Sequence, residues 1–313
     1  MSTYLVTGGA GFIGSHIVHA LVQRGDTVRV LDNLSTGNLD NLAAVAADVE
    51  VFEADLCDTE AVAQAVAGVE CIFHEAALAS VPRSVEHPLD TNQACVTGTV
   101  NLLDQARRAG VRRVVYAGSS SCYGDQPFSS KRETDQISPL SPYAAAKLAG
   151  EMYCKAFGHT YNLETVCLRY FNVFGPRQDP ASPYSAVIPL FMTAVLRGES
   201  PVVFGDGEQS RDFTFVENVV HGNLLAAESP HAPGRTFNVA TGRSFSLLTL
   251  LNSINRLLGA DIKPIFEDAR VGDVRDSLAD ISSARELLGY EPQVDFQEGL
   301  ERSFAYYREL CAS

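Results

Sequence analysis

The sequence predicts an α/β protein in which a doubly wound parallel sheet is followed by a smaller C-terminal lobe. In the first half, short runs rich in β-branched and aromatic residues alternate with amphipathic helical patterns, which is typical of βαβ units. A glycine-rich segment directly follows the first of these runs. The second half is looser, with Pro- and Gly-punctuated loops. We expect one part at 1–171 and another at 172–313, interleaved because no Pro/Gly/Ser linker divides them.

The predicted elements of the first half follow one another as strand and helix. The strands are the runs YLVTG, TVRVLD, VEVFEAD, CIFHEA, RRVVYAGS and ETVCLRYF. Helices are predicted from about Phe12 to Gln23, near Glu60 to Val66, from about Leu89 to Ala109, and over SPYAAAKLAGEMYCKAF. Right-handed crossovers between such strands give a Rossmann-like sheet. After Asn172 we expect two or three more helices and short strands such as RTFNVA, which we interpret as a substrate-binding lobe.

The bulk composition is that of a folded, acidic protein. The chain has 313 residues, of which 46% are hydrophobic and 9% aromatic, and it holds no long repetitive tract, so we expect it to fold throughout. Its formal net charge of -14 opposes binding to nucleic acid or anionic lipid, because both need clustered Lys and Arg. We expect neither partner, although placed arginines and a helix N-terminus can still hold an anionic small molecule.

Targeting signals and cysteine usage favour a cytoplasmic protein. The chain begins in a strand-like run without a signal-peptide pattern, and no apolar stretch reaches membrane-spanning length. The 7 cysteines are scattered and form no C-x-x-C pair or zinc-type cluster. We expect reduced thiols, no metal site and no contact with a membrane.

The glycine-rich segment after the first strand predicts a dinucleotide site. It reads Gly9-Ala-Gly11-Phe-Ile-Gly14, is preceded by Gly8, and leads into an apolar helix. The glycines permit a tight turn and close approach to a pyrophosphate, and the helix offers unpaired N–H groups. The next strand ends at Asp32, whose carboxylate suits ribose hydroxyls and repels a 2′-phosphate, so NAD is favoured over NADP.

Asp55 admits two interpretations. It follows the third strand, with Leu56 next to it, and this position suits a contact with the adenine edge. It also precedes the predicted helix from Asp58 to Val66, where a carboxylate commonly caps the first turn. The sequence leaves both roles open.

Three polar residues predict a catalytic group. The strand RRVVYAGS ends at Ser119, and Tyr143 with Lys147 at i+4 lies on a predicted helix that begins near Pro142. This spacing places both side chains on one helix face. A phenol is a poor base at neutral pH unless a cation stabilises its phenolate, and Lys147 and a nicotinamide cation both supply that charge. We expect Tyr143 to act as the base and Ser119 to hold the substrate hydroxyl.

These motifs together resemble a known family, the extended short-chain dehydrogenase/reductases, and within it the UDP-hexose 4-epimerases. The resemblance spans nearly the whole chain and is carried by TGGAGFIGSH, DNLSTG, HEAALASVPRS, SSSCYGDQP, SPYAAAK, LRYFNVFGPRQDP, GDGEQSRDF and GDVRDSLADIS. The segment RYFNVFGPRQDP, followed by YSAVIP, is similar to members that act on N-acetylated UDP-hexoses.

The resemblance implies a reaction and a set of binding residues. It implies tightly held NAD, hydride transfer from sugar C4, proton removal by Tyr143, rotation of a 4-keto sugar and return of the hydride to the other face. It implies cofactor contacts for the glycine loop and the helix start that follows, and for the ends of the next strands: Gly8, Gly11, Phe12, Ile13, Gly14, Asp32, Asn33, Ser35, Thr36, Gly37, Asp55, Leu56, Ala76, Ala77, Tyr143, Lys147 and Phe171. It implies substrate contacts for Ser80, Ser119, Ser120, Asn172, Gln178, Arg211, Arg270, Asp273 and Ser277, with both arginines on the diphosphate.

The identity of the hexose depends on a few positions in this resemblance. Ser80, Gln178 and Ser277 match the hexose pocket of N-acetyl-accepting relatives, and enzymes restricted to non-acetylated sugars carry a bulky tyrosine at the position of Ser277. A small residue there leaves room for an N-acetyl group. Short epimerases with a small residue at this position also accept both sugar types, so UDP-GlcNAc/UDP-GalNAc and UDP-Glc/UDP-Gal are both expected.

The chain departs from the family pattern at two points. Many relatives carry Asn shortly before the Gly of a V-x-G-T segment, whereas this chain has Ala94-Cys95 there. The position where some epimerases have a lysine after the fourth strand is Ala79 in this chain.

The family also implies a homodimer, formed by the helices near Leu89 to Ala109 and Pro142 to Phe157.

Three alternatives compete with a UDP-hexose 4-epimerase. A 4,6-dehydratase needs an acid pair just after the position of Ser119, and Ser120-Ser121 cannot supply it. A UDP-glucuronate 4-epimerase shares the catalytic group and needs a cation or donors for the C6 carboxylate. A non-catalytic NAD-binding scaffold or sensor on the same fold is the alternative from another class, but such proteins tend to lose the tyrosine and the lysine.

Overall fold

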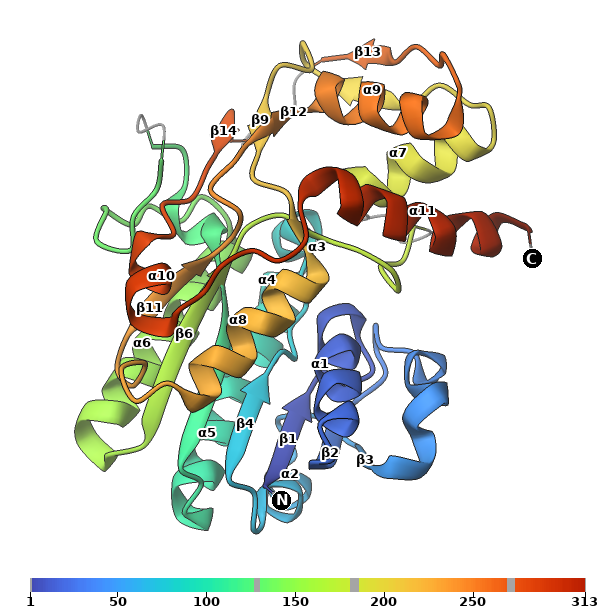
Figure 1. The fold of residues 1–313 in the computed structure, drawn as a ribbon. Coiled ribbons are helices and arrows are strands. Elements are labelled where there is room, and N and C mark those ends of the chain that lie inside the picture. The colour runs from blue at the N-terminus through green and yellow to red at the C-terminus, as the bar shows by residue number, and fades with distance from the viewer. Residues whose placement is uncertain (1, 127–129, 181–185, 269–273, 313) are drawn as a thin grey trace.

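A seven-stranded parallel sheet forms the centre of the molecule (Figure 1). The computed structural model describes residues 2–126, 130–180, 186–268 and 274–312. Its strand order is β11-β6-β5-β4-β1-β2-β3, and each neighbouring pair is parallel. The strands are β1 Thr3–Thr7, β2 Thr27–Asp32, β3 Val49–Glu53, β4 Cys71–His74, β5 Arg113–Ser119, β6 Glu164–Tyr170 and β11 Thr236–Val239. The predicted Rossmann-like fold class is confirmed.

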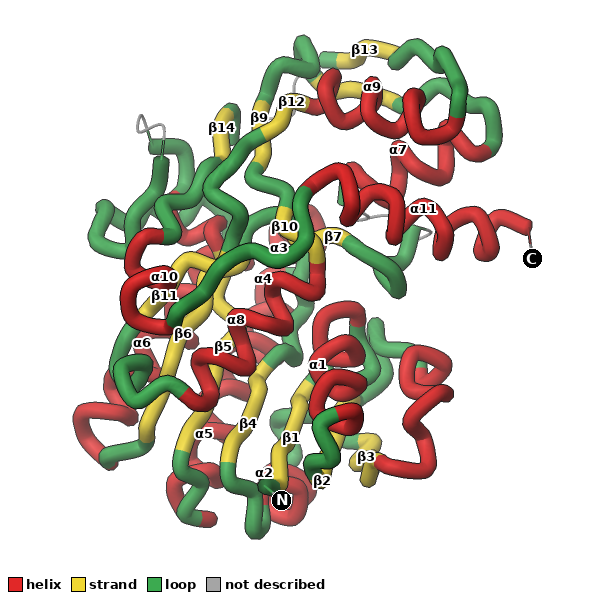
Figure 2. The backbone as a smooth tube through the Cα atoms, viewed as in Figure 1, coloured by secondary structure: helices red, strands yellow, loops and turns green. Residues whose placement is uncertain are grey.

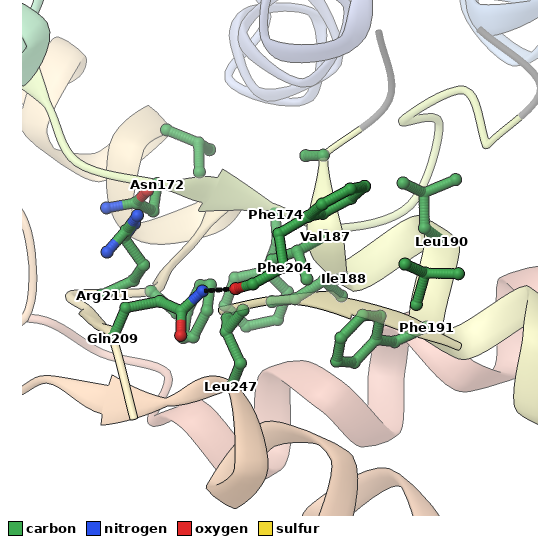
Figure 3. Close-up of a pocket in the computed structure, with 14 residues that line it drawn as sticks. Asn172, Phe174, Val187, Ile188, Leu190, Phe191, Phe204, Gln209, Arg211 and Leu247 are labelled. Carbon is green, nitrogen blue, oxygen red and sulfur yellow. Dashed lines mark hydrogen bonds between the residues drawn. The ribbon is translucent and has the colours of Figure 1, made fainter. Parts of the chain in front are cut away.

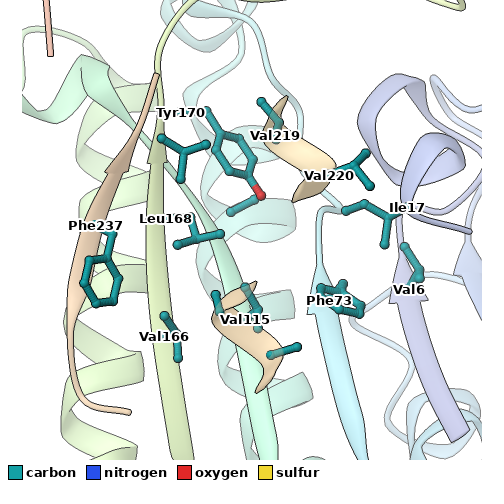
Figure 4. Close-up of a cluster of buried hydrophobic side chains, with 14 of the residues drawn as sticks. Val6, Ile17, Phe73, Val115, Val166, Leu168, Tyr170, Val219, Val220 and Phe237 are labelled. Atoms are coloured by element: carbon teal, nitrogen blue, oxygen red, sulfur yellow. The ribbon is translucent and has the colours of Figure 1, made fainter. Parts of the chain in front are cut away.

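Helices cover both faces of this sheet. Helices α1 (Phe12–Gln23), α8 (Val216–Glu228) and α10 (Ser282–Leu288) pack on one face. Figure 4 shows part of this core, where Val219 of α8 lies beside Tyr170 of β6 and Val220 lies beside Ile17 of α1. The opposite face carries α2 (Thr59–Val66), α5 (Gly98–Ala109) and α6 (Pro142–Tyr161). Burial of apolar side chains in both layers fixes the sheet between them.

The predicted helix from Leu89 to Ala109 is a composite in the structure. It consists of α4 (Pro88–Asn92), a π-helical turn (Gln93–Thr97) and α5, and the short helix α3 (Val81–Glu86) precedes it. In the wider turn the hydroxyl of Thr99 donates to the carbonyl of Cys95 at 2.7 Å. The helix also packs closely here, because a methyl group at Gly98 would lie 2.8 Å from Cβ of Leu56. Periodicity alone does not reveal such a turn.

The C-terminal lobe has its own core. Helices α7 (Val187–Leu196), α9 (Leu247–Leu258) and α11 (Phe296–Ala312) enclose a cluster rich in phenylalanine, including Phe174, Phe213 and Phe215. Short strands complete the lobe: β7 Val173–Phe174, β8 Val202–Phe204, β9 Ser210–Arg211, β10 Thr214–Phe215, β12 Phe245–Ser246, β13 Ile265–Glu267 and β14 Asp276–Ser277. Figure 2 shows several of these short strands beyond the main sheet, near α7, α9 and α11.

The number of helices after Asn172 differs from the prediction. The described part of the chain contains five, α7 to α11, rather than two or three. Some are short, such as the seven-residue α10, and loops rich in Pro and Gly separate them. The second half also returns to the main sheet, where β11 pairs with β6. The division at residue 172 stays a prediction about the chain.

Within the described ranges, no helix combines the length and the apolar character that crossing a bilayer requires.

Candidate active site

The carboxyl ends of the parallel strands bring the predicted residues to one edge of the sheet. The glycine loop follows β1, Asp32 ends β2, Ser119 ends β5 and Asn172 follows β6. This edge is where open α/β sheets bind ligands. The sheet therefore collects side chains from distant parts of the chain at one edge.

The glycine loop depends on residues without a side chain. Gly8 has φ +67°, and a methyl group there would lie 2.7 Å from the backbone nitrogen of Ala76. A methyl group at Gly14 would overlap the carbonyl oxygen of Gly8, while the N–H of Gly11 donates to that oxygen at 3.0 Å. The loop thus packs backbone against backbone, as the sequence predicts.

The start of α1 fits a pyrophosphate. Gly11 is its N-cap and makes no side-chain capping bond, and the first turn carries no acidic residue. The N–H groups of Phe12 and Ile13 lie in this uncapped turn, where helix geometry leaves them without partners inside the helix. The positive end of the helix then favours an anionic group.

Asp32 organises the loops around the predicted ribose position. Its carboxylate is buried and accepts from the N–H of Ala10 at 3.0 Å and from that of Leu34 at 2.9 Å. A methyl group at Gly37 would lie 2.8 Å from Oδ1 of Asp32. Each carboxylate oxygen has a second lone pair, so these bonds are compatible with the predicted contact to ribose hydroxyls.

Asp55 does not cap α2. The cap is Asp58, which accepts from the N–H groups of Glu60 and Ala61. Asp55 instead accepts from the N–H of Cys57 at 2.8 Å and from the Asn33 amide at 2.7 Å. Although burial opposes it, these two bonds lower the pKa of Asp55. The capping interpretation is wrong, and an anionic Asp55 beside Asn33 stays a candidate for the adenosine contact.

Other predicted cofactor residues follow the strands at this edge of the sheet. Ser35 and Thr36 are exposed after β2, and the N–H of Ser35 donates to Asn33. Leu56 is buried against Gly98, and the N–H of Ala76 donates to Thr7 Oγ1 at 3.4 Å, with Ala77 following it. Phe171 is fully buried, with its ring 6.1 Å from that of Tyr123. Their contacts with NAD stay predictions.

The structure brings Ser119 and Tyr143 together. Tyr143 lies in the first turn of α6, which Ser141 caps by accepting from the N–H of Ala144 at 3.2 Å. The side chain of Ser119 lies close enough to the Tyr143 phenol to lower its pKa. Ser119 Oγ also lies 2.8 Å from Oγ of Ser121, in the turn that begins at Ser120.

Lys147 is held beneath this pair. It is buried, its ammonium donates to the carbonyl of Ala117 at 2.8 Å, and its Nζ lies 5.1 Å from the ring centre of Tyr116. Burial lowers the pKa of Lys147 and raises that of Tyr143, although the nearby Ser119 side chain partly offsets the rise at Tyr143. Because the protein alone does not favour a phenolate at Tyr143, the base needs positive charge close by.

Three of the predicted substrate residues, Asn172, Arg211 and Ser277, lie together. Strand β14 pairs with β9 in parallel, which places Ser277 opposite Arg211. The Asn172 amide donates to Oγ of Ser277 at 3.5 Å, from a backbone with φ +35°. Ser277 is 8% exposed. Arg211 donates to the carbonyls of Ser210 and Arg275, which orients its guanidinium.

An apolar cavity extends from Asn172 and Arg211 into the lobe (Figure 3). Its wall is formed by Asn172, Val173, Phe174, Ala186, Val187, Ile188, Leu190, Phe191, Val202, Phe204, Gln209, Arg211, Phe213 and Leu247. The polar groups gather at one end, where Gln209 donates to the carbonyl of Phe204 at 2.6 Å. Such a cavity suits a flat ring at its apolar end and an anion at its polar end.

Not every predicted substrate residue joins this cavity. Ser80 caps α3 by accepting from the N–H of Arg83 at 3.2 Å. Gln178 donates to the carbonyl of Val173 at 3.2 Å, and the cavity wall includes neither residue. Arg270 and Asp273 lie outside the described residues. The hexose roles of Ser80 and Gln178 stay predictions.

Part of the site was not predicted from the sequence. Gln209, Phe204 and the α7 residues of the cavity wall were not predicted. The segment that becomes α7, VIPLFMTAVL, has more apolar residues than one buried face requires, and such an excess is a signal for a helix that also lines a ligand pocket. Gln209 lies in the quoted segment GDGEQSRDF beside Arg211.

Known proteins share this architecture. The chain matches the model of the NAD dependent epimerase/dehydratase family over residues 4–240. A UDP-glucose 4-epimerase of Mycolicibacterium smegmatis is 41% identical over 308 residues, which are 97% of this chain and 98% of the relative. The solved structure of UDP-N-acetylglucosamine 4-epimerase from Methanobrevibacter ruminantium, in complex with UDP-N-acetylmuramic acid, is 41% identical with a TM-score of 0.95, covering 99% of both chains.

A further solved structure bears on the cofactor. The Thermus thermophilus UDP-glucose 4-epimerase complex with NAD is 36% identical, with a TM-score of 0.90, and covers 98% of this chain and 99% of that one. This likeness agrees with the glycine loop and Asp32, so the predicted cofactor is confirmed. The chain belongs to the NAD dependent epimerase/dehydratase family, within the extended short-chain dehydrogenase/reductases, and is an NAD-dependent enzyme.

Proposed function

We propose that this protein is a 4-epimerase of UDP-hexoses that accepts both N-acetylated and plain sugars. The observation that carries the proposal is the arrangement around Tyr143: a phenol next to Ser119 at the sheet edge, with the buried Lys147 beneath it and an open cavity beside Asn172. This arrangement suits reversible oxidation of a secondary alcohol.

Each residue of the catalytic group has a role in this reaction. Ser119 orients the C4 hydroxyl of the sugar, Tyr143 removes its proton, and the charge of Lys147 stabilises the phenolate. NAD on the glycine loop supplies a reversible hydride acceptor. Tyr143 returns the proton after the keto sugar has turned over in the pocket, so the reaction has no net redox change.

The apolar cavity supports a UDP group. A uracil ring fits between Val187, Leu190 and Phe204, and the guanidinium of Arg211 suits a diphosphate at the polar end. With the uracil and the diphosphate bound in this way, the hexose would extend toward Asn172 and Ser277. This direction agrees with the position of Tyr143 at the sheet edge.

Ser277 supports acceptance of an N-acetyl group. Its side chain is small, and its hydroxyl is bonded to the Asn172 amide beside Arg211. The relatives are named for sugars of both kinds: one is a UDP-glucose 4-epimerase and another is a UDP-N-acetylglucosamine 4-epimerase. We therefore assign both substrate types to this chain.

A specific observation supports UDP-glucuronate as a second candidate. The Lys131 ammonium donates to the carbonyl of Asp276 at 2.9 Å, and Lys131 is buried. The Lys131 ammonium therefore binds the residue next to Ser277 in the chain, where a cation suits the C6 carboxylate of a glucuronate. Two solved structures of UDP-glucuronic acid 4-epimerase from Bacillus cereus are 27% identical to this chain.

A side-by-side assay tests the proposal. The NAD-loaded protein is incubated with UDP-Glc, UDP-GlcNAc and UDP-glucuronate, and the 4-epimers are separated by chromatography. We expect turnover of the first two. Turnover of UDP-glucuronate alone would favour the second candidate, and no product from any of the three, with NAD bound, would favour a non-catalytic NAD-binding protein.

We also propose a homodimer formed through α3, α4 and α6. These helices pack against one another and expose large apolar side chains, including Val85 at 64%, Leu89 at 81%, and Met152 and Tyr153 at 42% each. Such exposure on adjoining helices favours burial by a second copy.

A further inference from the structure

A carboxyl group outside the proposed catalytic group lies at the same sheet edge. Glu75 directly follows β4, and its N–H donates to the carbonyl of Thr7 at 3.1 Å. Its side chain is half-buried, and Oε1 accepts from the Tyr170 hydroxyl at 2.8 Å. That hydroxyl accepts from the fully buried Asn223 amide at 2.7 Å. Elements β4, β6 and α8 therefore fix the position of the carboxyl group.

Glu75 lies next to the catalytic pair in the sheet. The preceding residue, His74 of β4, pairs with Tyr116 of β5, and the Lys147 ammonium donates to the carbonyl of Ala117, the next residue along β5. Burial raises the pKa of Glu75 to about 7, although the bond from Tyr170 and the charge of Lys147 oppose the rise. In return, a negative charge on Glu75 raises the pKa of Tyr143 and that of Lys147. Its ionisation therefore makes the phenolate of Tyr143 harder to form and the ammonium of Lys147 easier to keep.

Few other charges face Glu75. Among the residues that the structure describes, the titratable neighbours are Tyr170 on β6 and Lys147 and Tyr143 on α6. Strand β1 contributes the backbone of Thr7, and α8 contributes the uncharged amide of Asn223. The hydrogen bond from the Tyr170 hydroxyl favours the charged carboxylate of Glu75 over the protonated carboxyl group.

We propose that Glu75 is a positioning residue for the epimerisation: its carboxylate, held by the Tyr170 hydroxyl, places a titratable charge beside Lys147 and controls how readily Tyr143 gives up its proton. This inference rests on the proposed function. In the wild-type chain, Glu75 ionises as the pH rises toward the range in which Tyr143 must lose its proton. The two ionisations oppose each other, so activity rises with pH over a broad range.

The pH dependence of kcat/KM for UDP-Glc tests this role in Glu75→Gln. The amide can still accept the Tyr170 bond, but it carries no charge. We expect the ascending limb to become steeper and to move to lower pH by about one unit, which is about tenfold in relative activity on that limb. A profile that changes only in height, or a variant without activity at any pH while it retains NAD, would overturn the proposal.

Tyr170→Phe is the matched control. It removes the hydrogen bond that favours the carboxylate, so Glu75 stays neutral to higher pH. The ascending limb of the pH profile should therefore again move to lower pH. In the Glu75→Gln background the same change should have no effect on the limb. A shift that persists there would contradict the proposal, as would an unmoved limb in Tyr170→Phe alone, which remains a test even where Glu75→Gln does not fold.

A second readout needs no turnover. The folded chain binds the Glu75 proton more tightly than the unfolded chain, so its free energy of unfolding should fall as pH rises from the ordinary 4.5 through about 7. Denaturant titrations of wild type and Glu75→Gln should differ in this window. If the free energy of unfolding changes with pH by the same amount in both proteins, the inference is overturned.

The two proposals fail in different ways. An active Glu75→Gln with a wild-type pH profile contradicts this inference alone, whereas an inactive wild type contradicts the proposed function.

Discussion

At the scale of single residues, burial shifts the pKa values of two site residues in the direction that opposes the proposed reaction. Burial raises the pKa of Tyr143 and lowers that of Lys147. Both shifts disfavour the charged forms that the proposed chemistry uses. The protein therefore depends on charges placed close together, and each placed charge is open to test.

The first residue-scale prediction concerns the base. Tyr143→Phe should lower kcat by about two to four orders of magnitude, because the ring remains and only the hydroxyl is lost. NAD content, measured by absorbance after denaturation, should stay at the wild-type level. A variant with wild-type turnover would show that Tyr143 is not the base.

The second prediction concerns the hexose pocket. In Ser277→Tyr, a large ring replaces a side chain that is 8% exposed beside Asn172. Its volume should lower kcat/KM for UDP-GlcNAc about tenfold more than for UDP-Glc. Ser277→Ala is the control, since it keeps the space and should preserve the ratio between the two substrates. Equal losses for both sugars in Ser277→Tyr would contradict a role in selecting the sugar.

At the scale of elements, local patterns predicted more than long-range pairings did. Tyr143 and Lys147 share one turn of α6, so their spacing identified them. The contact of Asn172 with Ser277 depends on the pairing of the two-residue strands β9 and β14, and no periodicity reports such short strands. The bond between Tyr170 and Glu75 joins residues 95 positions apart. For that reason the motifs were predictable, while the cavity wall and Glu75 were not.

The glycine loop yields an element-scale prediction. Gly14→Ala adds a methyl group that overlaps the Gly8 carbonyl, so the loop must move and NAD retention should fall. NAD is measured in the purified protein as above. Gly25→Ala at the other end of α1 is the control: its φ is +80° with nothing within 4 Å, so it should cost about 1–2 kcal/mol of stability but keep NAD. Equal NAD loss in both variants would contradict the prediction.

A buried histidine ties three elements together and yields a prediction for acid stability. His74 lies between the hydroxyls of Thr7 and Thr99, at 2.8 Å from each, and burial lowers its pKa to about 3. Because the unfolded chain binds this proton near pH ~6.5, the stability that His74 contributes above that pH is lost as the pH falls toward 3. Urea titrations at pH 7.5 and pH 5 should show a smaller acid-induced loss in His74→Gln than in wild type. An unchanged loss would mean that His74 does not cause it.

At the scale of the whole molecule, the exposed face of α3, α4 and α6 predicts the oligomeric state. Leu89→Asp places a charge at a side chain that is 81% exposed, and it should convert the proposed dimer into monomers in light scattering after gel filtration. Ile265→Asp is the control, because Ile265 is 53% exposed on β13 of the other lobe. Dissociation by both changes, or by neither, would contradict an interface at α4.

The pairing of β11 with β6 has a consequence for how the chain is made. Strand β6 ends at Tyr170, whereas its outer neighbour β11 spans Thr236–Val239. During synthesis the nascent sheet therefore keeps an open hydrogen-bonding edge at β6 until the ribosome has released the chain through Val239. A chain stopped at residue 171 would carry the whole glycine loop and the catalytic group on a sheet with that edge uncovered, and aggregation rather than a working half-enzyme is its expected fate.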